Sequence, residues 1–302
     1  MSLLAILLPI ALLQLNPANA APLRAPDELV NRPERPVDPS APTRPNDPTA
    51  RWLEQCLTQL ESDAARAHTQ SQIKLTDARG PERIAANHCL GLAATELGLW
   101  EDARIAFTSA RDETPDDEVR ARARFGAMAG NAALAGGNLA GALGLLERAE
   151  NDAQSAASAP LQVIAALDRA RALVAMNRGE EALEALETAT TLAPQESEGW
   201  LLKATLLRRL DRLGDAQAAI ERAVALDPQE TAIGLEAGVI AILSGREDAA
   251  RASWQSVIDI QPSSLAAQTA RGYLEQIGPA PEAQDPPASG EPVEAPSQGA
   301  NP

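Results

Sequence analysis

Apolar and small residues recur along this chain at a spacing of 34 residues. A Leu or Ile two residues before a proline marks this spacing at Pro194, Pro228 and Pro262. Pro81 and Pro115 are separated by the same interval upstream. A period of 34 is typical of stacked helix–turn–helix units. The pattern therefore predicts an array of helix pairs, which usually offers a surface for binding rather than a pocket for a reaction.

Six units fit this period when the three C-terminal prolines are placed at position 32. The units then begin at Ala50, Ile84, Ala123, Val163, Ser197 and Thr231. Insertions around 117–122 and 157–162 shift the third and fourth starts, and Gln154 replaces the proline once. The prolines are expected to end the second helix of each unit, because proline cannot continue a helix.

Two positions of the unit hold mostly small residues and a third holds a large apolar residue. Position 8 holds Leu57, Gly91, Gly130, Ala170, Ala204 and Gly238. Position 20 holds Thr69, Ala103, Ala142, Ala182, Ala216 and Ala250. Position 24 holds Ile73, Phe107, Leu146, Leu186, Ile220 and Trp254. The small residues would let the two helices of a unit approach closely, and the large one would fill the space between units.

Glycines gather near the middle of the units, where the first helix should end. They are Gly98, Gly136, Gly137, Gly179, Gly214 and Gly245. A helix C-terminus favours a residue that tolerates a positive φ. Acidic pairs such as Glu101-Asp102 and Glu247-Asp248 then begin the second helices, where they suit the positive end of the helix dipole.

These columns resemble the tetratricopeptide repeat, whose pattern is W-x2-L-G-x2-Y, then A-x3-F, then P. The fifth unit matches it with Trp200, Ala204, Ala216, Ile220 and Pro228. The resemblance covers about residues 50–262 and implies an all-α, right-handed superhelical solenoid of about six repeats. Residues 264–277 are expected to form a C-terminal capping helix, which extends the array to 50–277.

The first 20 residues are typical of a secretory signal peptide. An apolar run from Leu3 to Leu15 precedes Ala18-Asn19-Ala20, which matches a small-residue cleavage site. Cleavage after Ala20 would place the mature protein in the periplasm. An uncleaved membrane anchor is the alternative, although the run is short for a membrane span.

Two further segments differ in composition from the array. Residues 21–49 carry a proline at every third position from Pro33 to Pro48, which predicts an extended polyproline II linker. This linker would be a stiff spacer or, alternatively, a PxxP docking ligand. Residues 278–302 are rich in Pro, Ala and Glu, and are predicted to be a disordered acidic tail.

Composition narrows the classes of partner. The chain has 302 residues, a formal net charge of −16 and 2% aromatic residues. Its core must therefore be built mainly from Ala and Leu. Nucleic acids and anionic membranes require a basic face, so neither is expected as a partner, and a membrane becomes relevant only if the N-terminal segment stays uncleaved.

The two cysteines, Cys56 and Cys89, fall on the first helices of successive units. An even number of cysteines in an exported chain predicts one disulfide. The alternatives are a redox pair, free thiols, and a metal site completed by His68 and His88, although the spacing matches no usual set of zinc ligands.

No enzyme signature is found in the sequence. A G-x-S-x-G elbow, a phosphate-binding glycine loop and an H-E-x-x-H motif are all lacking. Asp116-Asp117 is interpreted as a helix start rather than an acid/base pair. The sequence thus predicts a protein that is not an enzyme, with no catalytic residue, cofactor, metal or small-molecule substrate.

The resemblance also implies a binding groove. In tetratricopeptide arrays the concave surface comes mostly from positions 2, 5, 9, 12 and 13 of the first helix. In repeats three to six these positions include Arg124, Asn131, Leu134, Ile164, Leu167, Arg171, Val174, Glu198, Leu201, Arg208, Arg209, Leu235, Val239, Ile242 and Leu243. Four arginines against one glutamate predict a protein or peptide partner that supplies carboxylates. The alternative is that the arginines are merely solvated and the capping helix buries the apolar residues.

Two functions from different classes follow from this interpretation. The first is a non-catalytic periplasmic scaffold or adaptor that binds a peptide or helix of a partner protein in the groove. The second is an accessory subunit of an envelope enzymatic assembly, such as cytochrome maturation or cell-wall and outer-membrane biogenesis, which presents a substrate to a catalytic partner.

Overall fold

The computed structural model describes residues 47–279, and within this range the chain forms thirteen α-helices and no strand. The all-helical class predicted from the sequence is confirmed. The predicted signal peptide, residues 21–46 of the proline-rich linker and residues 280–302 of the acidic tail lie outside the described residues. None of the helices between 47 and 279 is long and apolar enough to cross a membrane.

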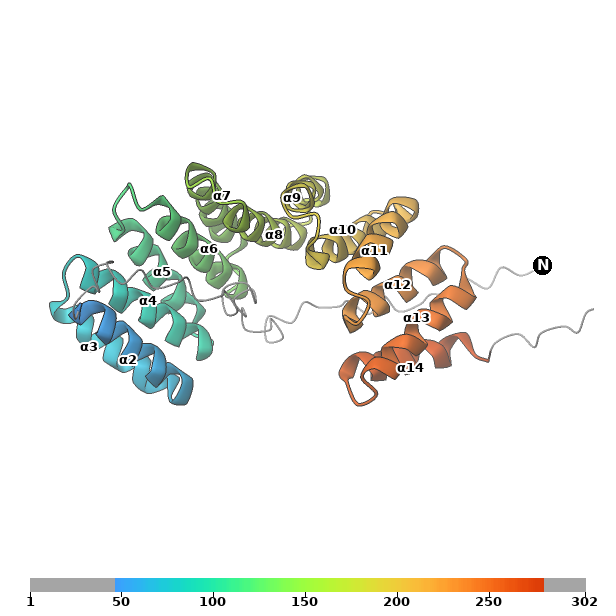
Figure 1. The fold of residues 1–302 in the computed structure, drawn as a ribbon, viewed down its shortest axis with the longest axis horizontal. Coiled ribbons are helices and arrows are strands. Elements are labelled where there is room, and N and C mark those ends of the chain that lie inside the picture. The colour runs from blue at the N-terminus through green and yellow to red at the C-terminus, as the bar shows by residue number, and fades with distance from the viewer. Residues whose placement is uncertain (1–46, 280–302) are drawn as a thin grey trace, which may run out of the picture. The chain divides into compact units, whose positions relative to one another are not determined.

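The helices form two compact units, which divide between Pro194 and Gln195. The first unit holds four helix pairs, coloured blue to olive in Figure 1: α2 (Pro48–Ser62) with α3 (Ala64–Asp77), α4 (Pro81–Glu96) with α5 (Trp100–Glu113), α6 (Val119–Ala135) with α7 (Leu139–Ser155), and α8 (Ala159–Ala175) with α9 (Gly179–Leu192). The second unit holds α10 (Ser197–Arg209) with α11 (Leu213–Leu226), α12 (Thr231–Leu243) with α13 (Glu247–Ile260), and the single helix α14 (Leu265–Ile277).

The large residue at position 24 packs on the small residue at position 8 of its own repeat. A Cβ atom added to Gly91 would lie 2.5 Å from Phe107, and one added to Gly238 would lie 2.1 Å from Nε1 of Trp254. Both distances are shorter than any real contact, so glycine is needed for the close approach. The predicted close approach of the two helices of a unit is therefore confirmed, and the residue at position 24, which was predicted to fill the space between units, also fills space within its own repeat.

The first helix of repeats two to six is followed, two residues after its last residue, by a residue with a left-handed backbone. This residue is at position 15 in every case: Gly98, Gly137, Asn177, Asp211 and Gly245. The next N–H then donates to a carbonyl five residues earlier, as from Leu99 to Ala94 at 2.8 Å and from Arg212 to Leu207 at 2.9 Å. These bonds are those of the Schellman motif.

The predicted role of two glycines in these turns is wrong. Gly179 and Gly214 lie within the first residues of α9 and α11 and have no positive φ. Asn177 and Asp211 take the left-handed position instead, with φ of 58° and 59°. Asn and Asp tolerate this conformation better than other non-glycine residues, so the turn keeps its geometry.

The first repeat departs from the predicted register. Its helices are separated by Asp63 alone, and α3 begins at position 15, two residues earlier than the second helix of the other repeats. Ala67 and Ser71 are therefore fully buried, while Ile73, predicted to fill the core, is 64% exposed. The assignment of Thr69 and Ile73 to positions 20 and 24 is corrected, because the shorter turn advances the helix.

Candidate functional site

A disulfide joins the first two repeats. Cys56 on α2 and Cys89 on α4 are bonded at 2.02 Å, with their Cα atoms 6.4 Å apart. Both residues are buried, and the Ser71 hydroxyl lies 3.3 Å from the sulfur of Cys56. Since both sulfurs take part in this bond, they cannot serve as ligands of a metal site with His68 and His88.

The two histidines have separate surroundings. Nε2 of His68 lies 3.7 Å from a carboxylate oxygen of Asp102. The ring of His88 instead packs edge-on against Phe125, with the ring centroids 5.2 Å apart. Within residues 47–279 no three His, Cys, Asp or Glu side chains are placed to hold a metal ion.

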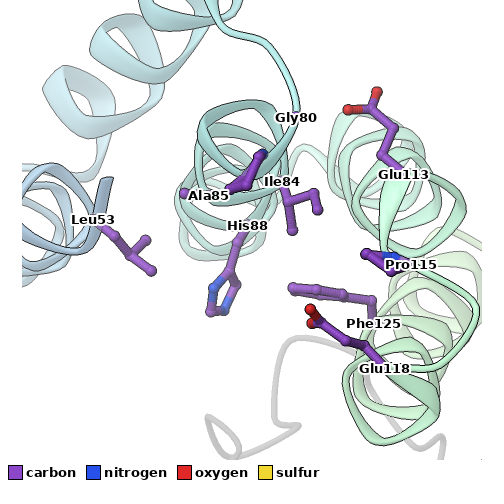
Figure 2. Close-up of a pocket in the computed structure, with 10 residues that line it drawn as sticks. Leu53, Gly80, Ile84, Ala85, His88, Glu113, Pro115, Glu118 and Phe125 are labelled. Atoms are coloured by element: carbon purple, nitrogen blue, oxygen red, sulfur yellow. The ribbon is translucent and has the colours of Figure 1, made fainter. Parts of the chain in front are cut away.

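A pocket of about 290 Å³ opens beside His88 in the first unit (Figure 2). It lies between α2, α4, the connection from α5 to α6, and α6. The residues that line it are Leu53, Gly80, Pro81, Ile84, Ala85, His88, Glu113, Pro115, Glu118 and Phe125. Most of this lining is apolar, and two carboxylates lie at its rim. Sequence reasoning missed the pocket, because the columns were compared for packing within a repeat, whereas the lining residues, which include Pro81 and Pro115 of the proline column, come from three successive repeats.

The interior of the pocket carries no charged side chain at neutral pH, and its two carboxylates lie at the rim. Burial, and to a smaller extent the charge of Arg124, lower the pKa of His88 from 6.5 to about 4. His88 is therefore neutral at neutral pH. At the rim, Glu113 accepts a hydrogen bond from Nε of Arg83 at 2.7 Å, whereas Glu118 is exposed and has no side-chain partner in the described part of the chain.

In the first unit, part of the predicted groove is a buried polar cluster. Asp168 is 3% exposed. It accepts hydrogen bonds from Nδ2 of Asn131 at 2.7 Å and from Nη1 of Arg171 at 2.6 Å. The prediction that Arg171 offers a charge to a partner is corrected, because a carboxylate of the same chain already binds it.

The other predicted groove residues of the first unit differ in exposure. Leu167 is only 6% exposed, so its assignment to a groove surface is wrong. Leu134 and Val174 are half-buried, and Leu134 packs against the core of the unit. Arg124 is exposed, and no described side chain pairs with it. Of the two arginines predicted to line the groove in this unit, Arg124 is the one that remains available to a partner.

In the second unit, Arg208 is also held by a carboxylate. Its Nε and Nη2 atoms donate to the two carboxylate oxygens of Glu236 at 2.6 and 3.2 Å. Glu236 is 8% exposed, which makes the pair largely buried. Arg209 beside it is exposed without a described partner, and Leu201 is half-buried. The expectation of free charge is therefore wrong for Arg208 and stays open for Arg209.

The apolar residues predicted at the C-terminal end of the groove are partly covered. Leu235, Val239 and Ile242 on α12 pack against a buried cluster that includes Ala270 of α14, and Tyr273 and Leu274 of α14 pack against the same cluster. This arrangement agrees with the alternative interpretation, in which the capping helix buries them. They are half-buried rather than free to line an open groove.

The two carboxylates that bind Arg171 and Arg208 occupy the same position in their repeats. Asp168 and Glu236 both stand at position 6, which was not among the positions assigned to the concave surface. Asn131 and Arg208 reach them from the preceding repeat. An acidic residue at position 6, recurring after two repeats, was the signal in the sequence that could have revealed these contacts.

The comparisons with known proteins agree with this architecture. A family model described as the tetratricopeptide repeat matches residues 167–230 and 201–264. None of the curated proteins matches the chain. A solved structure of PilF from Pseudomonas aeruginosa is similar, with 16% identity, a TM-score of 0.57, and coverage of 75% of this chain and 97% of that one.

A second solved structure is that of a MamA fragment from Desulfovibrio magneticus RS-1. It shares 16% identity with this chain at a TM-score of 0.51, and the match covers 62% of this chain and 99% of the fragment. At these identities the likeness establishes the fold. The match to the tetratricopeptide-repeat model lies within residues 167–264, and the contact between positions 8 and 24 is consistent with the architecture of that repeat.

Proposed function

We propose that this protein is a non-catalytic scaffold that binds a segment of a partner protein along the first helices of its repeats. The observation that most supports this function is that Arg124 and Arg209 are exposed and are not bound by a carboxylate of the described residues. Each is exposed on a first helix, at a position that tetratricopeptide arrays use for binding, and each lacks a partner among the described residues. Arginine is enriched at interfaces, and a guanidinium that no internal carboxylate holds can bind one from a partner.

The partner that suits this face carries carboxylates. Arg124 on α6 and Arg209 on α10 lie in different units, so each is proposed as a contact of its own. The half-buried Val174 and Leu201 offer apolar area on the same first-helix faces. Charge-assisted hydrogen bonds would orient the segment, and burial of apolar area would add affinity.

Single charge reversals test this function. The partner is captured by crosslinking in the cell envelope, identified by mass spectrometry and purified for titration. Arg124→Glu or Arg209→Glu should weaken its binding at least about tenfold, which is about 1.4 kcal/mol. Arg66→Glu is the matched control. Arg66 is exposed on α3, the second helix of the first repeat, and its charge reversal should leave the affinity for the partner unchanged. Equal affinities for all three variants and the wild type would exclude the first-helix face.

We also propose that the protein is periplasmic. The sequence support is the apolar run followed by Ala18-Asn19-Ala20. The Cys56–Cys89 disulfide adds support, because such bonds persist in oxidising compartments. The intact mass of the protein released by osmotic shock should correspond to a chain that begins at Ala21. A full-length species held in the membrane would overturn the proposal.

A further inference from the structure

The pocket beside His88 lies at the end of the array where the chain enters it. The first helices α2 and α4 run in the same direction, because α3 returns between them, and α6 follows in the same way. The lining residues include Leu53 and Ile84, which lie in the N-terminal halves of α2 and α4, and Glu118, which directly precedes α6 (Figure 2). Asp47 caps α2 at this same end, with its carboxylate accepting from the N–H of Thr49 at 2.9 Å. The described chain therefore begins, at Asp47, at the same end of the array as the pocket.

The lining suits a proline ring. Leu53 and Ile84 supply aliphatic walls, and the edge-on pair of His88 and Phe125 supplies an aromatic one. Proline-rich segments dock on aromatic-lined grooves of this kind, because an extended proline helix loses little conformational entropy on binding. The neutral state of His88 keeps the wall free of charge.

The charges at the rim complement the segment that enters the array. Glu113 and Glu118 place carboxylates at the opening of the pocket. Residues 21–46 contain three Arg-Pro pairs, at 32–33, 35–36 and 44–45. A proline inside the pocket would thus bring the preceding arginine to the acidic rim. Glu118 is the better acceptor, since Glu113 is already bound to Arg83.

We propose that the proline-rich segment of residues 21–46 docks in this pocket of its own chain, with an Arg-Pro pair as the anchor. The tether favours the internal ligand, because a short linker gives an effective concentration of about millimolar. The pairs are within reach, since an extended proline helix covers about 3.1 Å per residue. The segment is then a ligand of the array and not only a spacer, and this inference does not depend on the proposed partner face.

The experiment uses the full chain labelled with 4-fluorophenylalanine. The sequence contains two phenylalanines, so the ¹⁹F spectrum has two resonances. Phe125 lines the pocket, and Phe107 is 2% exposed in the core and serves as an internal reference. Changing Pro33, Pro36 and Pro45 to alanine should shift the resonance of Phe125 and leave that of Phe107 in place. The matched control is the same change at three prolines of the C-terminal segment, Pro281, Pro286 and Pro287, which should leave both resonances unchanged.

A change at the rim tests the proposal from the other side. Glu118→Lys should move the Phe125 resonance to the position found for the proline variants, whereas Asp117→Lys, an exposed neighbour, should not. The wild-type resonance should stay constant over about a hundredfold dilution, because the ligand is tethered. A Phe125 resonance that is the same in the wild type and the proline variants would overturn the proposal. A resonance that moves on dilution would also overturn it and would indicate a second copy of the chain as the occupant.

Discussion

The guanidinium of Arg208 binds the carboxylate of Glu236 through two hydrogen bonds, with Nε to Oε1 at 2.6 Å and Nη2 to Oε2 at 3.2 Å. This pair joins the first helix of the fifth repeat, α10, to that of the sixth, α12. Because Glu236 is 8% exposed, its charge has little access to water. The pair therefore serves the packing of the second unit and not the binding of a partner.

Arg208→Met should strongly destabilise the protein. It leaves the buried carboxylate of Glu236 without its partner, at a cost of about 3 kcal/mol. Adding Glu236→Leu should recover most of the loss, since an apolar pair of similar volume can replace a buried ion pair. Arg209→Met, next to it but exposed and unpaired, is the control and should have little effect. Urea denaturation measures all three, and equal midpoints for Arg208→Met and Arg209→Met would contradict the structural role.

Gly238→Ala should also destabilise the second unit. The added Cβ would lie 2.1 Å from Nε1 of Trp254, whose N–H donates to the Leu235 carbonyl at 3.2 Å. The indole must shift, and overpacking of this kind costs about 1–3 kcal/mol. Gly272→Ala on α14 meets no atom within 4 Å and should stabilise by about 0.5–1 kcal/mol. Denaturation followed by tryptophan fluorescence separates the two, and a neutral Gly238→Ala would show that the pair of helices can relax.

The sequence predicted the close approach of the two helices of a repeat, because small residues recur at position 8, and the surroundings of Gly91 and Gly238 confirm it. The large residue at position 24 was expected to fill the space between units. In the structure Phe107 and Trp254 also pack on Gly91 and Gly238 of their own repeats, 16 residues away in sequence. The first repeat could not be predicted in this way. Its single-residue turn at Asp63 moves α3 forward by two positions, and a frame of fixed length cannot detect such a shift.

The candidate binding face was predicted less well, for a different physical reason. The resemblance identified positions that face outward in general, but the availability of a side chain depends on its neighbours in three dimensions. Asp168 and Glu236 bind Arg171 and Arg208, and α14 covers part of α12. These contacts join repeats rather than positions within a repeat, so a column-by-column comparison does not contain them.

Loss of the disulfide should weaken the start of the array. Cys56 and Cys89 are 33 residues apart in sequence, and closing a loop of this size stabilises by roughly 3–4 kcal/mol in the chain-entropy model. The Cys56→Ala, Cys89→Ala double variant should lose about this much in urea denaturation. The wild type treated with a reductant is the control and should approach the variant. Two thiols that react with an alkylating agent in freshly isolated native protein would show that the bond does not form in the cell.

Stability should fall as the pH is lowered from 6.5 towards 4, because His88 must remain neutral in the folded protein. Burial is the main cause that lowers its pKa from 6.5 to about 4, with Arg124 second. Between these values the unfolded chain binds the extra proton and the folded chain does not, so acid favours unfolding by up to about 3 kcal/mol. His88→Phe keeps a ring against Phe125 and should flatten the slope between pH 6.5 and about 5, above the usual range of carboxylates. His68→Gln leaves His88 in place and should retain the slope. Urea midpoints across this window measure the effect, and an equal slope in wild type and His88→Phe would mean that another group carries the pH dependence.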